Sequence, residues 1–182
     1  SNDPVTDPVG EAIYLKDAES GALWSPTAQP IRNTGRYVAA HGFGYSRFAH
    51  QAYGIESELV CYVPLSDPVR ISRLTLTNRS GRARRLSFTS YDEFVRGIQR
   101  GSRGPFIISA IDPQTGAMLA RNKWAMTFPG RVAFADMGGR QTAWTADRTA
   151  FLGRAGSAAA PAGLAGGAAL NGKTGAGFDP CA

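Results

Sequence analysis

The strongest constraint on the fold is an alternation of apolar and polar residues, with a period of two, that recurs along much of the chain. Between residues 55 and 63 one side carries Ile55, Leu59, Cys61 and Val63. The other side carries Glu56, Glu58, Val60 and Tyr62. Successive side chains of a β-strand point to opposite faces, so this pattern predicts a strand with one face in a core. Cys61 is then expected to be a small buried hydrophobe.

The same period predicts further short strands. They span residues 71–77, 86–94, 106–111, 118–121, 131–136 and 142–144. The first two are joined by the turn-rich string 78–81, so together they predict a long β-hairpin. Turn-forming residues recur at intervals of roughly 8–12 residues, as in an all-β sandwich, and helical periodicity is nearly absent. The fold class predicted from the pattern is all-β, built from antiparallel strands.

Two segments share one turn pattern, an Asp followed three residues later by Ser or Thr and then by Gly and Ala. They are residues 17–23 and 112–118. The Asp can accept hydrogen bonds from backbone N–H groups two or three residues on, and the Gly can take a positive φ. Each segment is flanked by apolar residues, so we expect two hairpin turns with shared turn chemistry.

The length of 182 residues is typical of one domain with a sizeable core. Residues 1–6 are polar and are expected to lie outside the fold, with Ser1 and Asn2 as an expression tag. The β-sandwich is expected over residues 7–152. Residues 153–182 shift to Gly, Ala and Pro, which predicts a long loop leading into a final part of the same domain that is cut short.

The formal net charge of +6 could indicate a nucleic-acid partner, but the arginines favour another interpretation. They cluster at two places, one at residues 79–85 and one at residues 96–103, and no nucleic-acid-binding motif accompanies them. A solvated arginine-rich surface explains this pattern. No apolar run approaches the roughly 20 residues that a membrane-spanning helix needs, so no membrane contact by this chain is expected. Cys61 and Cys181 are far apart and lack metal-ligand spacing.

A series of short sequence motifs, taken in order, resembles the N-terminal β-sandwich domain of the inverting glycoside phosphorylases of glycoside hydrolase family 94, which includes cellobiose phosphorylase. The motifs are residues 14–17, 20–21, 24–27, 41–48, 54–55, 63–65, 67–69, 74–78 and 87–91. Residues 138–145, 147–148 and 151–154 are most similar to the branch found in cyclic β-1,2-glucan synthases. Two positions depart from the family pattern: Ala40 replaces a usual Arg, and Phe94 replaces a common Trp.

The resemblance implies a β-supersandwich of the galactose mutarotase-like type. It also implies that this domain precedes a catalytic (α/α)6 barrel, which is absent from these 182 residues. The implied partners are that barrel, a β-glucan oligosaccharide bound by the parent enzyme, and a second copy in a homodimer. The implied location is the cytoplasmic face of the bacterial inner membrane, within a larger membrane protein. No cofactor, metal or catalytic residue is implied for the chain itself.

The candidate residues for carbohydrate contact or barrel docking lie in the two most specific motifs and the segment between them. They are Trp24, Tyr37, His41, Phe43, Tyr45 and Arg47. Trp24 could stack on a sugar face, although a Trp at a strand end more often plugs a core. His41 has no nucleophile or carboxylate nearby in the sequence, so a structural role is favoured. Glu56 and Glu58 share one strand face and could not flank a glycosidic bond from both sides.

Three hypotheses of function follow. The first is an accessory domain of a cyclic β-1,2-glucan synthase or glycoside phosphorylase, packing on the barrel and shaping glucan binding. The second is a stand-alone carbohydrate-binding module, which requires exposed aromatic side chains at Trp24, Tyr37, Phe43 and Tyr45. The third is a structural or dimerisation scaffold with an exposed apolar patch.

Overall fold

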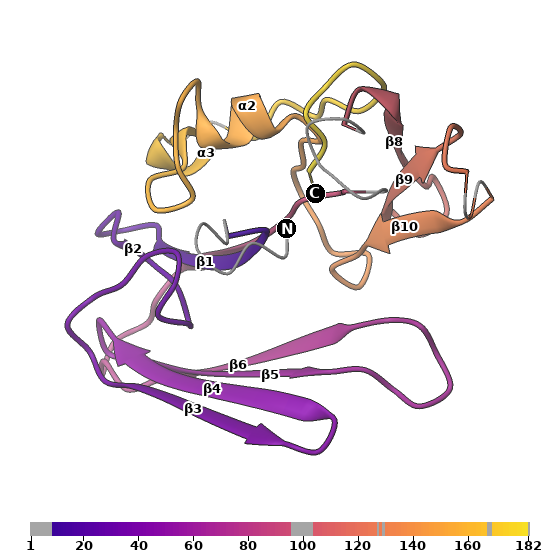
Figure 1. Ribbon diagram of the computed structural model, residues 1–182. Coiled ribbons are helices and arrows are strands. Elements are labelled where there is room, and N and C mark those ends of the chain that lie inside the picture. Colours follow the sequence, from indigo (N-terminus) through magenta and orange to yellow (C-terminus); the bar gives the residue numbers. More distant parts are fainter. Residues whose placement is uncertain (1–8, 96–103, 127, 129, 167–168, 182) are drawn as a thin grey trace. The chain divides into compact units, whose positions relative to one another are not determined.

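The computed structural model describes residues 9–95, 104–126, 128, 130–166 and 169–181 (Figure 1). The chain forms two compact units. The N-terminal unit comprises Ala12–Ser90, and the C-terminal unit comprises Tyr91–Ala182 together with Ser1–Glu11. In the described residues the regular structure is nearly all antiparallel β, which confirms the predicted class. The predicted arginine cluster at 96–103 lies outside the described residues.

The N-terminal unit contains a long four-stranded antiparallel sheet in the order β3-β4-β5-β6 (Figure 1). Its strands are β3 (Tyr37–Gly42), β4 (Tyr45–Ala52), β5 (Ile55–Tyr62) and β6 (Ile71–Asn78). The turn between β4 and β5 consists of Tyr53 and Gly54, at φ +51° and +78°, the two positive values that a type I′ hairpin turn requires. The Tyr53 ring packs 5.2 Å from that of Trp24, which helps to hold this non-glycine residue in the left-handed region.

A second sheet, in the order β2-β1-β7, joins β1 (Glu11–Asp17), β2 (Leu23–Trp24) and β7 (Leu86–Asp92). The predicted first turn is confirmed: Asp17 accepts a bond from the N–H of Glu19 and Gly21 has φ +71°. In the N-terminal unit, apolar side chains from this sheet pack against one end of the long sheet. The buried members of this cluster are Leu15, Trp24, Ala52 and Ile55.

The predicted hairpin of residues 71–77 and 86–94 is wrong, because β6 pairs with β5 whereas β7 pairs with β1. The polar connection between them carries the chain from one sheet to the other. Asn78 closes its start by accepting from the N–H of Ser80 and donating to the carbonyl of Arg82. Arg84 then donates from Nε to the buried carboxylate of Asp17, 3.0 Å away. The arginine cluster is thus explained by the turn and its ion pairs.

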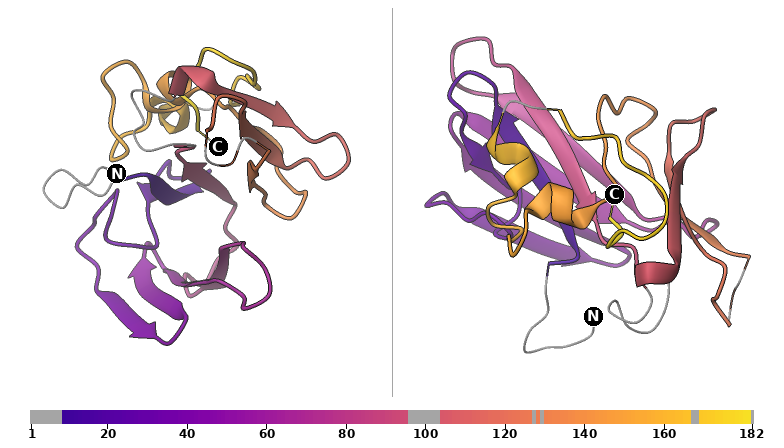
Figure 2. Two further views of the ribbon diagram at one scale, coloured as in Figure 1. Left: turned by 45° about the vertical axis from the view of Figure 1, so that its right-hand side comes forward. Right: turned by 90° about the horizontal axis from the view of Figure 1, so that it is seen from above.

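In the C-terminal unit, β8 (Ile107–Ile111), β9 (Met118–Asn122) and β10 (Val132–Ala135) form an antiparallel sheet in the order β10-β9-β8 (Figure 2). A single 3-10 turn, Gly104–Phe106, precedes β8. The second predicted turn is confirmed: Asp112 accepts from the N–H of Thr115, and Gly116 has φ +77°. The buried core beneath this sheet consists of Phe94, Ile107, Met118, Ala120 and Ala146. Phe94 therefore occupies a core position.

The predicted strand at residues 142–144 is wrong: in the described structure this segment begins with a bend at Thr142 and belongs to no strand. Two backbone bonds hold it and its continuation, from Gly172 N to Trp144 O and from Ala146 N to Lys173 O. Two short helices occur as well, α2 (Arg148–Leu152) and α3 (Ala162–Ala165). Both are too short to show helical periodicity, which is why the sequence pattern missed them.

The segment before residue 182 is joined to the C-terminal unit by two isolated β-bridges, Glu93 with Cys181 and Asp147 with Pro180. Arg148 strengthens this connection, because its Nε lies 2.9 Å from Glu93 Oε1 and its backbone N–H donates to the carbonyl of Asp179. Burial raises the pKa of the Cys181 thiol to about 12. The domain boundary predicted at residues 152–153 stays a prediction.

Candidate functional site

The four-stranded sheet carries most of the candidate residues, and its register decides which of them share a face. In antiparallel strands, directly paired residues project to the same side. One row of pairs joins Tyr37, His50, Ser57 and Leu76, and another joins Ala39, Phe48, Leu59 and Leu74. His50, Ser57 and Leu59 are buried, so we call this side the inner face. The alternate rows, with Arg47 and Glu58, form the outer face.

At one end of this sheet lies a cluster of exposed apolar side chains that we call the tip surface. It consists of the exposed side chains Phe43, Tyr45, Val63 and Leu65, with the partly buried Tyr62 among them. Gly42, Tyr45, Tyr62 and Ile71 are paired across the four strands, which brings the β3–β4 turn and the β5–β6 loop to the same end of the sheet (Figure 1). The Phe43 and Leu65 side chains are fully exposed, and Tyr45 is 48% exposed.

Two glycines shape the β3–β4 turn. Gly44 follows Phe43 with φ +80°, in the left-handed region that favours glycine. Gly42 is needed for another reason: a Cβ atom there would lie 2.2 Å from a ring carbon of Tyr45. The Tyr45 ring therefore lies across the backbone of Gly42. This contact holds one aromatic ring flat on the outer face while Phe43 projects from the turn.

The structure divides the six candidate residues among four places. Tyr45 and Arg47 are on the outer face, and Tyr37 and His41 are on the inner face, because alternation separates them. Phe43 is at the turn itself. Trp24 is 0% exposed and belongs to the core cluster, so the packing interpretation holds for it and its ring faces are not offered to a ligand.

The inner-face candidates have structural partners. The Nδ1 atom of His41 is 2.9 Å from Ser46 Oγ, and its ring meets the Phe48 ring edge to face at 6.0 Å. Tyr37 stacks on the buried His50, with ring centroids 3.7 Å apart, and its hydroxyl accepts from the N–H of Asn33. His41 is exposed despite these contacts, so its structural role stays a prediction.

The outer-face carboxylates are neutralised by arginines. Arg47 donates from Nε to Glu58 Oε2 at 2.7 Å, and Arg79 donates to Glu56 Oε2 at 3.1 Å. All four side chains are well exposed, so each pair contributes little to stability, about 0–1 kcal/mol. Glu56 and Glu58 thus fit the expected solvated strand face and do not form a facing pair of carboxylates.

Cys61 is half-exposed, which corrects the expectation that it is buried. It lies on the inner face in the row of His41, Ser46 and Ser72, beyond the part of this face that the buried residues occupy. Its Sγ atom is 3.5 Å from Ser72 Oγ. The alternation correctly predicted the face of the sheet on which Cys61 lies. It does not show how far along the strand that face is covered by other residues.

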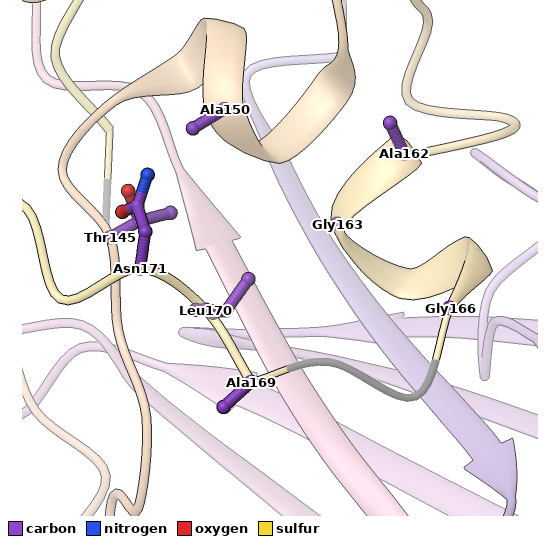
Figure 3. Close-up of a pocket in the computed structure, with 8 residues that line it drawn as sticks. All are labelled: Thr145, Ala150, Ala162, Gly163, Gly166, Ala169, Leu170 and Asn171. Carbon is purple, nitrogen blue, oxygen red and sulfur yellow. The ribbon is translucent and has the colours of Figure 1, made fainter.

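Two hollows lie outside the tip surface. In the N-terminal unit a groove of about 370 Å³ runs beside edge strand β3, between the segment 26–29 and residues of β3 and β4 such as Tyr37 and Phe48. In the C-terminal unit a smaller pocket of about 160 Å³ is lined mainly by small side chains (Figure 3). Its few larger groups are Thr145, Leu170 and Asn171. Neither hollow gathers an acid, a base and a nucleophile.

No group of three or more His, Cys, Asp or Glu side chains among the described residues gathers closely enough to hold a metal ion. None of the helices in the described part of the chain is long and apolar enough to cross a membrane.

Comparison with known proteins identifies the family. The family model described as "Glycosyl hydrolase 94, supersandwich domain" matches residues 1–182. The chain belongs to this family. The β-supersandwich and the resemblance to family 94 phosphorylases are therefore confirmed, and the antiparallel sheets of the structure agree with them.

Individual relatives place this domain in large proteins. The chain is 38% identical over 183 residues to the cyclic β-(1,2)-glucan synthase NdvB of Rhizobium meliloti, a match that covers 100% of the chain and 6% of that protein. It is 32% identical over 169 residues to the solabiose phosphorylase of Paenibacillus borealis, covering 87% of the chain and 21% of the relative. An N,N'-diacetylchitobiose phosphorylase of Vibrio proteolyticus matches 48% of the chain at 32% identity. The chain thus corresponds to a small part of glycan-acting enzymes.

Sequence reasoning missed part of the tip surface. Tyr62, Val63 and Leu65 join Phe43 and Tyr45 only through the strand register, which a single sequence does not give. The available signal was the exposed apolar run 63–65 directly after a strand and before a polar turn.

Proposed function

We propose that this chain is a non-catalytic accessory domain of a longer enzyme of the cyclic β-1,2-glucan synthase or glycoside phosphorylase type. One observation carries the proposal: the family match spans the whole chain, yet the matched region is 6% of the Rhizobium meliloti synthase and 21% of the Paenibacillus borealis phosphorylase. The chemistry named in those relatives then belongs to their remaining parts. In this account the domain packs on a catalytic (α/α)6 barrel and shapes how glucan reaches it.

The tip surface supports a role in glucan contact. Exposed aromatic rings can stack on the C–H faces of sugars, and Phe43 and Tyr45 offer two such rings at the end of one rigid sheet. Arg47, one residue pair further along the outer face, could donate to sugar hydroxyls beside its bond to Glu58. We assign glucan contact to Phe43, Tyr45 and Arg47, and we leave Trp24 out because it is buried.

The test is a titration of β-1,2-gluco-oligosaccharides into the isotopically labelled 182-residue chain, with backbone amide shifts as the readout. We expect saturable shifts at Phe43, Gly44 and Tyr45 at sugar concentrations on the order of millimolar, about −4 kcal/mol of binding free energy. Phe43→Ala should abolish them. The matched control is Leu65→Ala, which removes an equally exposed side chain without an aromatic ring.

Two other functions predict different results. A stand-alone carbohydrate-binding module would bind the sugar equally well in the chain and in the longer protein. A pure scaffold would show no shifts with any oligosaccharide, while the longer protein would lose stability when the domain is removed. The exposed rings of Phe43 and Tyr45 favour glucan contact over a pure scaffold.

We also propose the location and the assembly implied by the resemblance. The longer protein would be a membrane protein of the bacterial inner membrane with this domain on the cytoplasmic face, and the domain would contribute to a homodimer. Protease accessibility in sealed membrane vesicles of known orientation tests the first statement. Sedimentation of the longer protein tests the second.

A further inference from the structure

The C-terminal unit exposes a second apolar surface, which has no role in the function proposed above. The β8–β10 sheet has one side in the core, with Ile107, Met118 and Ala120 buried, and an opposite side that carries Ile108, Val132 and Phe134. The β9–β10 loop adds Trp124, Met126 and Phe128, and Phe106 lies at the start of β8. We call this set of seven side chains the β8–β10 face.

These apolar side chains are highly exposed and occur together, unlike apolar residues that are scattered singly over a protein surface. Met126 is 92% exposed and Trp124 is 70% exposed. Phe106 and Trp124 pack with their ring centroids 6.0 Å apart, and the Arg131 guanidinium lies 4.2 Å from the centre of the Phe128 ring. The rings and the arginine thus pack in two pairs within this face. Trp, Phe, Met and Arg are the residue types enriched in protein interfaces, where contiguous apolar patches of this kind are normally covered.

The basic residues around the β8–β10 face limit the kind of partner that can cover it. Arg121 lies on the same side of the sheet, paired with Ile108 and Val132, and Lys123 and Arg131 flank the loop. Among the described residues, no acidic partner is found for Arg121 or Lys123. Asp112 and Asp136 lie at the other end of these strands. The β8–β10 face is therefore apolar with a basic edge, and it complements an apolar surface with an acidic edge.

This charge pattern disfavours two other occupants. In a two-fold dimer whose strands run parallel across the interface, Arg121, Lys123 and Arg131 would face the same basic residues of the second copy. The net charge of +6 adds to that repulsion. A glucan chain would need hydrogen-bonding groups between the rings, whereas Ile108, Val132 and Met126 offer none.

We propose that the β8–β10 face is the surface on which the catalytic part of the longer polypeptide docks, through an apolar face edged by acidic residues. This inference rests on the proposed accessory function and names the surface that serves it. The relatives support the need for such a partner, because most of their length lies outside the region matched by this chain. Trp124 and Met126 would be the central contacts, and Arg121 and Lys123 would pair with acids of the partner.

Hydroxyl-radical footprinting tests this, because Met, Trp and Phe side chains react readily when exposed. The 182-residue chain and the longer polypeptide are oxidised side by side, and the rate at each residue is measured by mass spectrometry. We expect the rates at Trp124 and Met126 to fall about tenfold in the longer polypeptide, as for side chains in a desolvated interface centre. Arg121→Glu with Lys123→Glu should restore much of the oxidation, whereas Arg154→Glu, an exposed arginine after α2, should not.

Each other outcome overturns the proposal in a distinct way. Unchanged rates at Trp124 and Met126, with protection at Phe43, would refute this docking surface and leave the accessory function standing. Protection at neither surface would refute both. Protection that rises with the concentration of the 182-residue chain alone would assign the face to a second copy. Protection by added β-1,2-gluco-oligosaccharide would assign it to sugar.

Discussion

Replacement of Trp24 tests the interpretation of the N-terminal core most sharply. Trp24 is completely buried, packs with Leu15, Ala52 and Ile55, and lies beside the ring of Tyr53. Trp24→Ala removes the whole indole from a cluster that cannot collapse around it. We expect the free energy of unfolding to fall by about 3–5 kcal/mol, the range for large aromatic-to-alanine changes in protein cores.

Trp24→Phe should behave differently, and the reason is the indole nitrogen. Among the described residues, Nε1 of Trp24 is buried and has no hydrogen-bond partner. Phe loses apolar contact equivalent to about two methylene groups, roughly 1.6 kcal/mol. It also removes the unsatisfied donor, whose burial costs about 1–3 kcal/mol. The two effects offset each other, so the free energy of unfolding should change by less than about 1 kcal/mol.

The assay is equilibrium unfolding in urea, followed by far-UV circular dichroism. Trp124→Ala is the control, because that side chain is exposed and its loss in the isolated chain should change stability by no more than about 0.5 kcal/mol. The reasoning is refuted if Trp24→Ala leaves the midpoint and slope of unfolding unchanged. A Trp24→Phe variant as unstable as Trp24→Ala would refute the argument from the unsatisfied nitrogen.

Three further predictions follow from single contacts. Gly42→Ala should displace the Tyr45 ring, because the new Cβ would overlap it, and the chemical shifts of the Tyr45 ring protons should change; unchanged ring-proton shifts would contradict the contact. The backbone N–H of Glu19, together with Arg84, lowers the pKa of Asp17 to about 2, so this carboxylate stabilises the fold above its ordinary value near 3.8 and less as pH falls toward 2. Urea unfolding should therefore show a steeper loss of stability between pH 4 and 2 for the natural chain than for Asp17→Asn, and equal slopes would refute this. At pH 8 Cys61 should react with a maleimide much faster than the buried Cys181; similar rates would contradict the burial and raised pKa of Cys181.

The local features of the fold were predictable because they depend on neighbouring residues. The alternation from Ile55 to Tyr62 gave the strand and its faces, and the two Asp-to-Gly turns formed as their turn chemistry requires. The pairing of strands was not predictable in the same way. The hairpin expected for residues 71–94 failed because β7 pairs with β1, and the ion pair of Arg84 with the distant Asp17 favours that arrangement.

The candidate site shows the same division between local and long-range information. Phe43 and Tyr45 were two of four aromatic candidates, and both are exposed because a glycine-flanked turn places them at a sheet end. Trp24 was a candidate as well, but it packs with Leu15, Ala52 and Ile55, and such tertiary contacts bury it. The exposure of Trp124 and Met126 likewise depends on which side of the β8–β10 sheet faces the core. Surface and core aromatics are separated by tertiary packing, which a single strand pattern does not contain.

The most direct test of the accessory role is made in the longer polypeptide, by measuring the lengths of the oligosaccharides that it produces from β-1,2-glucan in the presence of phosphate. The natural protein is compared with Phe43→Ala/Tyr45→Ala and with the control Thr75→Ala on the same sheet. We predict that the double variant retains turnover at saturating glucan but shifts the distribution of product lengths and raises KM by about tenfold, equivalent to 1.4 kcal/mol of lost glucan contact. Loss of all turnover in a folded double variant, or an unchanged product distribution and KM, would contradict the account.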